Sequence, residues 1–115
     1  MSHKEINLRS KSQDAAATEI MYEIAACRAD GIELIRFNIS YGDSNESITE
    51  GKRILSSIVR TLKNMKQKGS IQFIATPDSF ESGSTESSFL YNKFPSLFSS
   101  KPTCSEDESF IYVKL

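Results

Sequence analysis

The segment GIELIRFNIS, residues 31–40, decides the fold class of this chain because its side chains alternate between apolar and polar. A period of two is typical of a β-strand that buries one of its faces. The alternating residues are Ile35, Arg36, Phe37, Asn38 and Ile39. We therefore predict a strand over residues 32–40.

A helix is predicted on each side of this strand. Upstream, Ser12 is placed to cap a helix over residues 13–29. Downstream, Ser47 and Glu50 have the spacing of a capping box, and apolar residues at helical spacing continue from there to Gly69. The apolar positions are Ala16, Ala17, Ile20, Ile24 and Cys27 in the first helix, and Ile48, Leu55, Ile58, Leu62 and Met65 in the second.

Shorter alternating segments at residues 5–9, 71–75 and 110–115 predict three further strands. Right-handed crossovers between neighbouring parallel strands place both helices on the same side of the sheet. The predicted fold is an α/β two-layer sandwich of β-α-β-α-β-β order, with a mixed four-stranded sheet and two helices on one face. At 115 residues the chain has the length of a single domain.

Residues 76–109 form an insertion before the last strand, rich in serine and containing all three prolines. Long connections of this kind in compact domains are commonly functional or mobile. A short helix over residues 86–93 is predicted within it, beside a cluster of apolar side chains. That cluster comprises Phe89, Leu90, Tyr91, Phe94, Leu97 and Phe98. It is interpreted either as additional core or as a docking surface for a protein partner.

Composition excludes several classes of protein. The net charge is −1, so any attraction for a polyanion has to come from local clustering. No apolar run is long enough for a membrane span or a signal peptide, and Cys27 and Cys104 are not patterned as a disulfide framework. We therefore expect a cytoplasmic protein that has no membrane association. With His3 as the single histidine, we expect no metal site and no cofactor.

The order of elements resembles a known family. A short strand leads directly into an alanine-rich helix, and GIELIRFNISYGDS is followed by a helix with a basic outer face, a third strand and a last strand ending Val113-Lys114-Leu115. In order and spacing, residues 5–75 and 110–115 resemble the Smr (small MutS-related) domain. The resemblance implies a small β-α-β-α-β-β sandwich and an association with binding and cleaving nucleic acid.

The motifs of that family are replaced in this chain. Where the family has Leu-Asp-Leu-His-Gly, residues 6–10 read Ile-Asn-Leu-Arg-Ser, and where it has His-Gly-x-Gly, residues 41–44 read Tyr-Gly-Asp-Ser. Arg9 and Tyr41 thus stand at the positions of the family's histidines, and neither residue type titrates near neutral pH as a general base must. We expect no catalytic residues here, and a nuclease with a relocated active site is the alternative.

The second helix carries the charge that nucleic-acid binding requires. It has six basic residues against the single acid Glu50, and four of them fall within roughly a 100° arc opposite the apolar face: Lys52, Arg53, Arg60 and Lys63. Arg9, Asn38 and Tyr41 lie at strand ends and extend this surface, and Tyr41 could stack on a base. The predicted binding residues, for the backbone of RNA or DNA, are Arg9, Asn38, Tyr41, Lys52, Arg53, Arg60 and Lys63. An ordinary solvated helix face would explain the same charges.

Overall fold

The protein is described by a computed structural model that covers residues 3–8, 11–40, 45–76, 79, 83–95 and 108–115. Its strands are β1 (His3–Asn7), β2 (Leu34–Ser40), β3 (Phe73–Ala75) and β4 (Glu108–Lys114). They form one sheet in the order β1-β2-β4-β3. β1 runs parallel to β2, whereas β4 is antiparallel to both β2 and β3. The predicted mixed four-stranded sheet is therefore confirmed.

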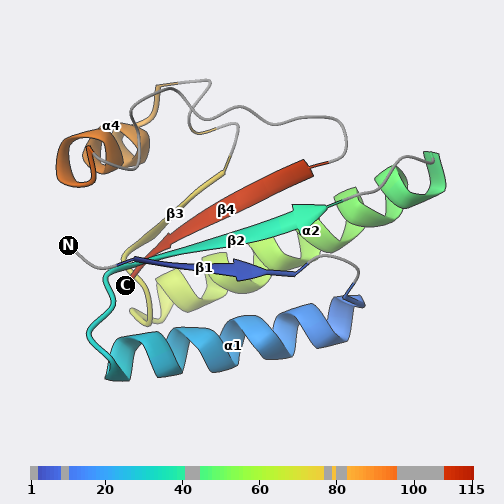
Figure 1. Ribbon diagram of the computed structural model, residues 1–115, viewed down its shortest axis with the longest axis horizontal. Helices are drawn as coiled ribbons and strands as arrows, with labels where there is room; N and C mark the ends of the chain where they lie inside the picture. Colours follow the sequence, from blue (N-terminus) through green and yellow to red (C-terminus); the bar gives the residue numbers. More distant parts are fainter. Residues whose placement is uncertain (1–2, 9–10, 41–44, 77–78, 80–82, 96–107) are drawn as a thin grey trace.

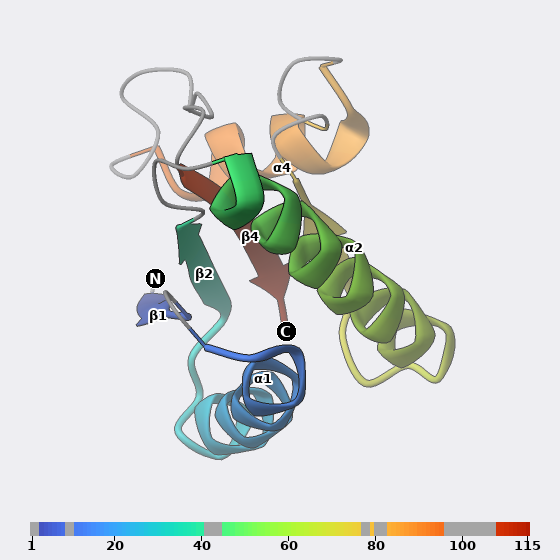
Figure 2. The ribbon, with the colours of Figure 1, turned by 90° about the vertical axis from the view of Figure 1, so that its right-hand side faces the viewer.

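Helices α1 (Gln13–Ala29) and α2 (Asn45–Gln67) lie side by side against one face of this sheet (Figures 1 and 2). The Ser12 side chain caps α1 by accepting a hydrogen bond of 3.2 Å from the backbone N–H of Ala15. Gly31 follows that helix in the left-handed conformation, with φ of 75°. The predicted two helices on one face of the sheet are confirmed.

The core between the helices and the sheet is built from the apolar positions of the alternating pattern. Phe37 and Ile35 of β2 are fully buried there, as are Ile111 and Val113 of β4. The helices contribute Ala16, Ile20, Ile24 and Cys27 from α1, and Ile54, Ile58 and Leu62 from α2. Because successive side chains of a strand point to opposite faces, the polar residues of β2 are directed away from this core.

The opposite face of the sheet is covered in part by a third helix, α4 (Thr85–Lys93), which Figure 1 shows beside β3. Leu90 of α4 and Phe94 just after it are buried in a second apolar cluster. The sheet supplies Leu34, Ala75, Phe110 and Tyr112 to that cluster, with Phe73 packed against it. This part of the insertion is additional core, whereas Leu97 and Phe98 lie outside the described residues.

Several element boundaries differ from the predicted ones. β1 spans His3–Asn7 and not residues 5–9. Its first residues pair with β2 although they are polar, so the apolar pattern of the sequence does not reveal them. β4 begins at Glu108, which pairs with Ser40, so the strand starts inside the predicted 76–109 insertion. β3 begins only at Phe73.

The start of α2 was also wrong in the prediction. The helix begins at Asn45, so Ser47 lies two residues inside the helix and not at its start, where the prediction placed it. The helix consequently includes Glu46 as a second acid beside Glu50. Among the described residues, no helix is both long enough and apolar enough to cross a membrane.

The role of α4 as core is testable by truncating its fully buried side chain. We expect Leu90→Ala to lower the free energy of unfolding by about 2–5 kcal/mol, the usual cost of deleting a buried leucine. Ser88→Ala is the matched control, because Ser88 lies two residues away in the same helix and is exposed. Its free energy of unfolding should stay within about 0.5 kcal/mol of the wild-type value. Urea denaturation followed by far-UV circular dichroism measures both, and equal effects would mean that α4 does not pack on the sheet.

Candidate nucleic-acid interface

The outer face of α2 presents three basic side chains to solvent. Lys52, Arg60 and Lys63 are all exposed, because the helix turns its apolar side, including Ile58 and Leu62, toward the sheet. None of the three has an ion-pair partner among the residues that the structure describes. Lys66 continues the same exposed side one turn further on. We call Lys52, Arg60, Lys63 and Lys66 the basic face of α2.

Arg53, the fourth predicted helix residue, is already engaged within the chain. Its Nε and Nη2 atoms donate to the two carboxylate oxygens of Glu50 at 3.1 and 2.5 Å. Its Nη1 atom donates to Oε1 of Gln13 at 3.0 Å, and Nε2 of Gln13 donates to Oγ of Ser57 at 2.9 Å. Gln13 opens α1, so this group of side chains connects the start of α1 to α2.

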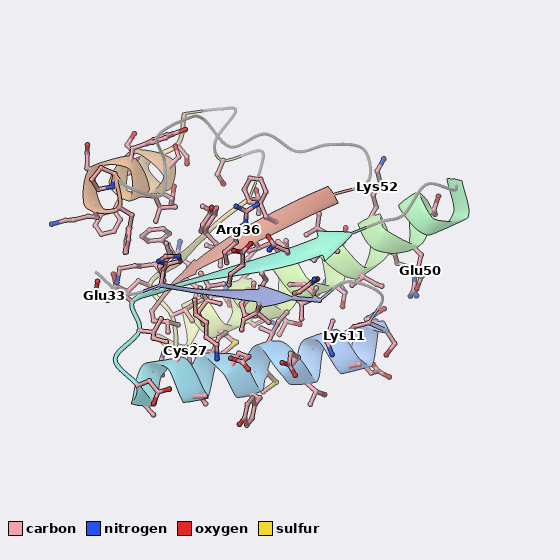
Figure 3. All side chains as sticks on the ribbon, in the orientation of Figure 1. Lys11, Cys27, Glu33, Arg36, Glu50 and Lys52 are labelled. Atoms are coloured by element: carbon pink, nitrogen blue, oxygen red, sulfur yellow. The ribbon has the colours of Figure 1, made fainter. Side chains whose placement is uncertain are left out.

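The Arg53–Glu50 pair also changes the local charge. The hydrogen bonds from Arg53 lower the pKa of the Glu50 carboxyl, and the carboxylate in turn raises the pKa of Arg53. Both side chains are therefore charged at neutral pH and offset each other. Figure 3 shows Lys52 and Glu50 extending from opposite sides of α2. The charge of the basic face is thus separate from this pair.

Asn38, another predicted binding residue, lies on the opposite face of the sheet. The flanking Phe37 and Ile39 are buried in the core against the helices, so the alternation directs Asn38 away from α2. Its Nδ2 donates to the carboxylate of Glu5, and its Oδ1 accepts from Nε of Arg36 at 2.7 Å. The structure therefore does not bring Asn38 together with the basic face. Arg9 and Tyr41 lie outside the described residues.

Arg36 is the centre of a polar cluster that sequence reasoning missed (Figure 3). Its guanidinium lies 4.9 Å from the ring centre of Phe110 and 5.6 Å from that of Tyr112, within the range of a cation–π interaction. Nη1 of Arg36 donates to the hydroxyl of Tyr112 at 3.3 Å, and Nε lies 4.0 Å from Glu5. These groups contact one another across β1, β2 and β4, on the face of the sheet opposite α1 and α2.

A second cluster, between β1 and α1, contains an amine, a carboxylate and a thiol, the kinds of group that a relocated catalytic site would need. Nζ of Lys4 donates to Glu23 at 3.0 Å, and the Cys27 thiol lies 4.0 Å from the same carboxylate oxygen. Burial raises the pKa of the Cys27 thiol, which keeps it protonated, whereas a nucleophilic cysteine requires a lowered pKa. The described part of the chain also has no group of three His, Cys, Asp or Glu residues placed to hold a metal ion.

Comparison with known proteins gives no relative on which to base a function. No protein-family model matches the chain, and no curated protein and no solved structure matches it either. The resemblance to the Smr domain therefore stays a prediction.

The environment of Tyr112 provides a pH-dependent test of how deeply this tyrosine is packed. Burial raises the pKa of the Tyr112 hydroxyl above its ordinary 10.0, although the nearby Arg36 acts in the opposite direction. A raised folded-state pKa means that the phenol stabilises the fold below its unfolded pKa and that this contribution is lost as pH rises through the folded value. In an ultraviolet titration of phenolate formation, we expect Tyr112→Phe to remove a transition above pH 10.0.

The same titration in concentrated urea is the control, since unfolding removes the burial. The transition that Tyr112→Phe deletes should then move down to the ordinary tyrosine range, about pH 10. If the deleted transition has the same midpoint in the folded and the unfolded protein, Tyr112 is not packed as the structure shows.

Proposed function

We propose that this chain binds the sugar–phosphate backbone of nucleic acid through the basic face of α2, without cleaving it. The observation that carries the proposal is the exposure of Lys52, Arg60 and Lys63 on one side of a helix, with no anionic partner among the described residues. Phosphate contacts of this kind provide affinity independent of sequence.

The dimensions of the basic face suit an extended phosphate chain. At a rise of 1.5 Å per residue, the stretch from Lys52 to Lys66 is about 21 Å long. One strand of a duplex advances by about 3.4 Å for each nucleotide, so this length corresponds to about six phosphates. Because the net charge of the chain is −1, such binding would depend on this local cluster and fall steeply with salt.

The proposed interface is smaller than the one predicted from sequence. Arg53 is held by Glu50 and Gln13, and Asn38 is held by Arg36 and Glu5 on the other face of the sheet. We therefore assign the backbone contacts to the basic face of α2, and Arg9 and Tyr41, which lie outside the described residues, stay predictions. The proposal includes the resemblance to a divergent Smr domain, which the order of strands and helices supports and the comparisons do not.

The alternative of a protein-interaction module working through residues 76–109 has less in its favour. Leu90 and Phe94, which would be the apolar anchors of a docking surface, are buried against the sheet. Phe89 and Tyr91 are partly buried in the same cluster. Among the described residues, the exposed large apolar side chains are Met21 and Tyr22, and both belong to α1 and not to the insertion.

Charge reversal on α2 tests the proposal. We expect Lys52→Glu/Arg60→Glu/Lys63→Glu to weaken binding to RNA and DNA and to reduce the slope of log affinity against log salt by roughly 0.7–0.9 for each lost contact. Folding should be retained, since exposed substitutions usually change stability by about 0.5 kcal/mol or less each. Fluorescence anisotropy of labelled oligonucleotides at several salt concentrations measures the effect.

A pair of single variants separates this site from general electrostatics. Lys63→Glu on α2 and Lys93→Glu on α4 change the net charge equally, and both positions are exposed. The proposal requires the first to weaken binding more than the second. It fails if the wild type shows no salt-dependent binding at low ionic strength, or if the two variants bind equally.

We also expect the chain to leave nucleic acid intact. Supercoiled plasmid and structured RNA incubated with the purified chain and Mg²⁺ or Mn²⁺ should stay uncleaved, because Arg9 and Tyr41 replace the motif histidines and the Cys27 thiol is protonated. Gel electrophoresis reports the outcome. Cleavage that disappears in Asp43→Asn or Cys27→Ala would instead identify a relocated nuclease site.

A further inference from the structure

Helix α1 has an exposed face that is also apolar. Its core side contains Ala16, Ile20, Ile24 and Cys27, all buried. The residues directed away from the core are Ala15, Thr18, Tyr22, Ala25 and Ala29, all exposed, with Met21 beside them. Tyr22 and Met21 are 66% and 57% exposed and are the large hydrophobic side chains that the described chain leaves in solvent. Figures 1 and 2 show no described element against this side of α1.

The spacing of this face is that of a helix-pairing seam. Residues 15, 18, 22, 25 and 29 alternate steps of three and four, the repeat by which two helices meet along their length. Except for Tyr22, each of these residues is small, so a second helix could approach closely along the face. A large aromatic side chain at the middle of such a contact has the character of an interface anchor.

The face is complementary to itself when it is read in the opposite direction. With two copies of α1 antiparallel and a two-fold axis between Met21 and Tyr22, Thr18 lies opposite Ala25 of the second copy, and Ala15 lies within one residue of the level of Ala29. On the flank, Asp14 in the first turn meets Arg28 in the last turn, and Met21 meets Met21. A two-fold interface requires this self-complementarity, and the antiparallel arrangement brings the acidic first turn of each α1 beside the basic last turn of the other.

We propose that α1 pairs in antiparallel orientation with α1 of a second copy of this chain, across a two-fold axis at Met21 and Tyr22. One helix pair provides an interface at the low end of the observed range, below about 1,200 Å² in total, so the dimer is weak and concentration-dependent. This inference does not depend on the proposed nucleic-acid binding, because it involves α1 and not the basic face of α2.

Sedimentation velocity of the full chain over a wide concentration series tests the dimer. The wild type should shift from monomer to dimer as concentration rises, and Tyr22→Glu should weaken dimerisation by at least about tenfold. Asn92→Glu, at an exposed position of α4 on the other side of the sheet, is the control and should dimerise as the wild type does. A wild type that is monomeric at every concentration overturns the proposal, as does a Tyr22→Glu variant that dimerises normally.

Disulfide trapping tests the orientation. In a Cys104→Ser background, Ala15→Cys and Ala29→Cys chains are made separately, mixed and oxidised, with Cys27 buried and out of reach. Antiparallel pairing predicts that the mixed 15–29 disulfide forms faster than either disulfide between identical chains. Preferential formation of the 15–15 and 29–29 disulfides, or equal rates for all three, would overturn the antiparallel arrangement.

Discussion

Strand β2 is the element on which the rest of this fold depends. It pairs on one side with β1 and on the other with β4, and its alternation supplies both apolar clusters. Phe37 and Ile35 lie under α1 and α2, whereas Leu34 lies in the cluster that α4 covers. A shift of this strand by one residue would exchange the two faces and expose the core, so its register is strongly specified.

The two helices on the common face of the sheet differ in what they present to solvent. α2 presents the basic face, whereas α1 presents a largely apolar face centred on Met21 and Tyr22. Between them, Gln13 of α1 bonds to Arg53 and Ser57 of α2, and Arg53 also pairs with Glu50 within its own helix. The charge of α2 is therefore divided: Arg53 is paired with Glu50 and Gln13, whereas Lys52, Arg60 and Lys63 have no ion-pair partner among the described residues.

Much of the fold was predictable from local patterns. Each of the main elements is marked by residues that are close together in the sequence. The alternation of residues 35–39 marks a strand, Ser12 marks the start of α1, and the apolar spacing marks both long helices. The helix inside the insertion was also predicted close to its observed bounds. The candidate site was predictable only in part. The exposure of Lys52, Arg60 and Lys63 follows from helical periodicity. The hydrogen-bond partners of Arg53 and Asn38 cannot be predicted from any local pattern.

The sequence by itself determined which segments form helices and strands and which of their sides are apolar, because those properties depend on residues one to four positions apart. Only the tertiary structure decided which polar residues are free. Arg36 meets Tyr112, 76 positions away, and Arg53 meets Gln13, 40 positions away, through strand pairing and helix packing. Such contacts depend on register and on the order of strands in the sheet, and no local pattern encodes them. The same packing leaves the outer faces of α1 and α2 without a covering element among the described residues.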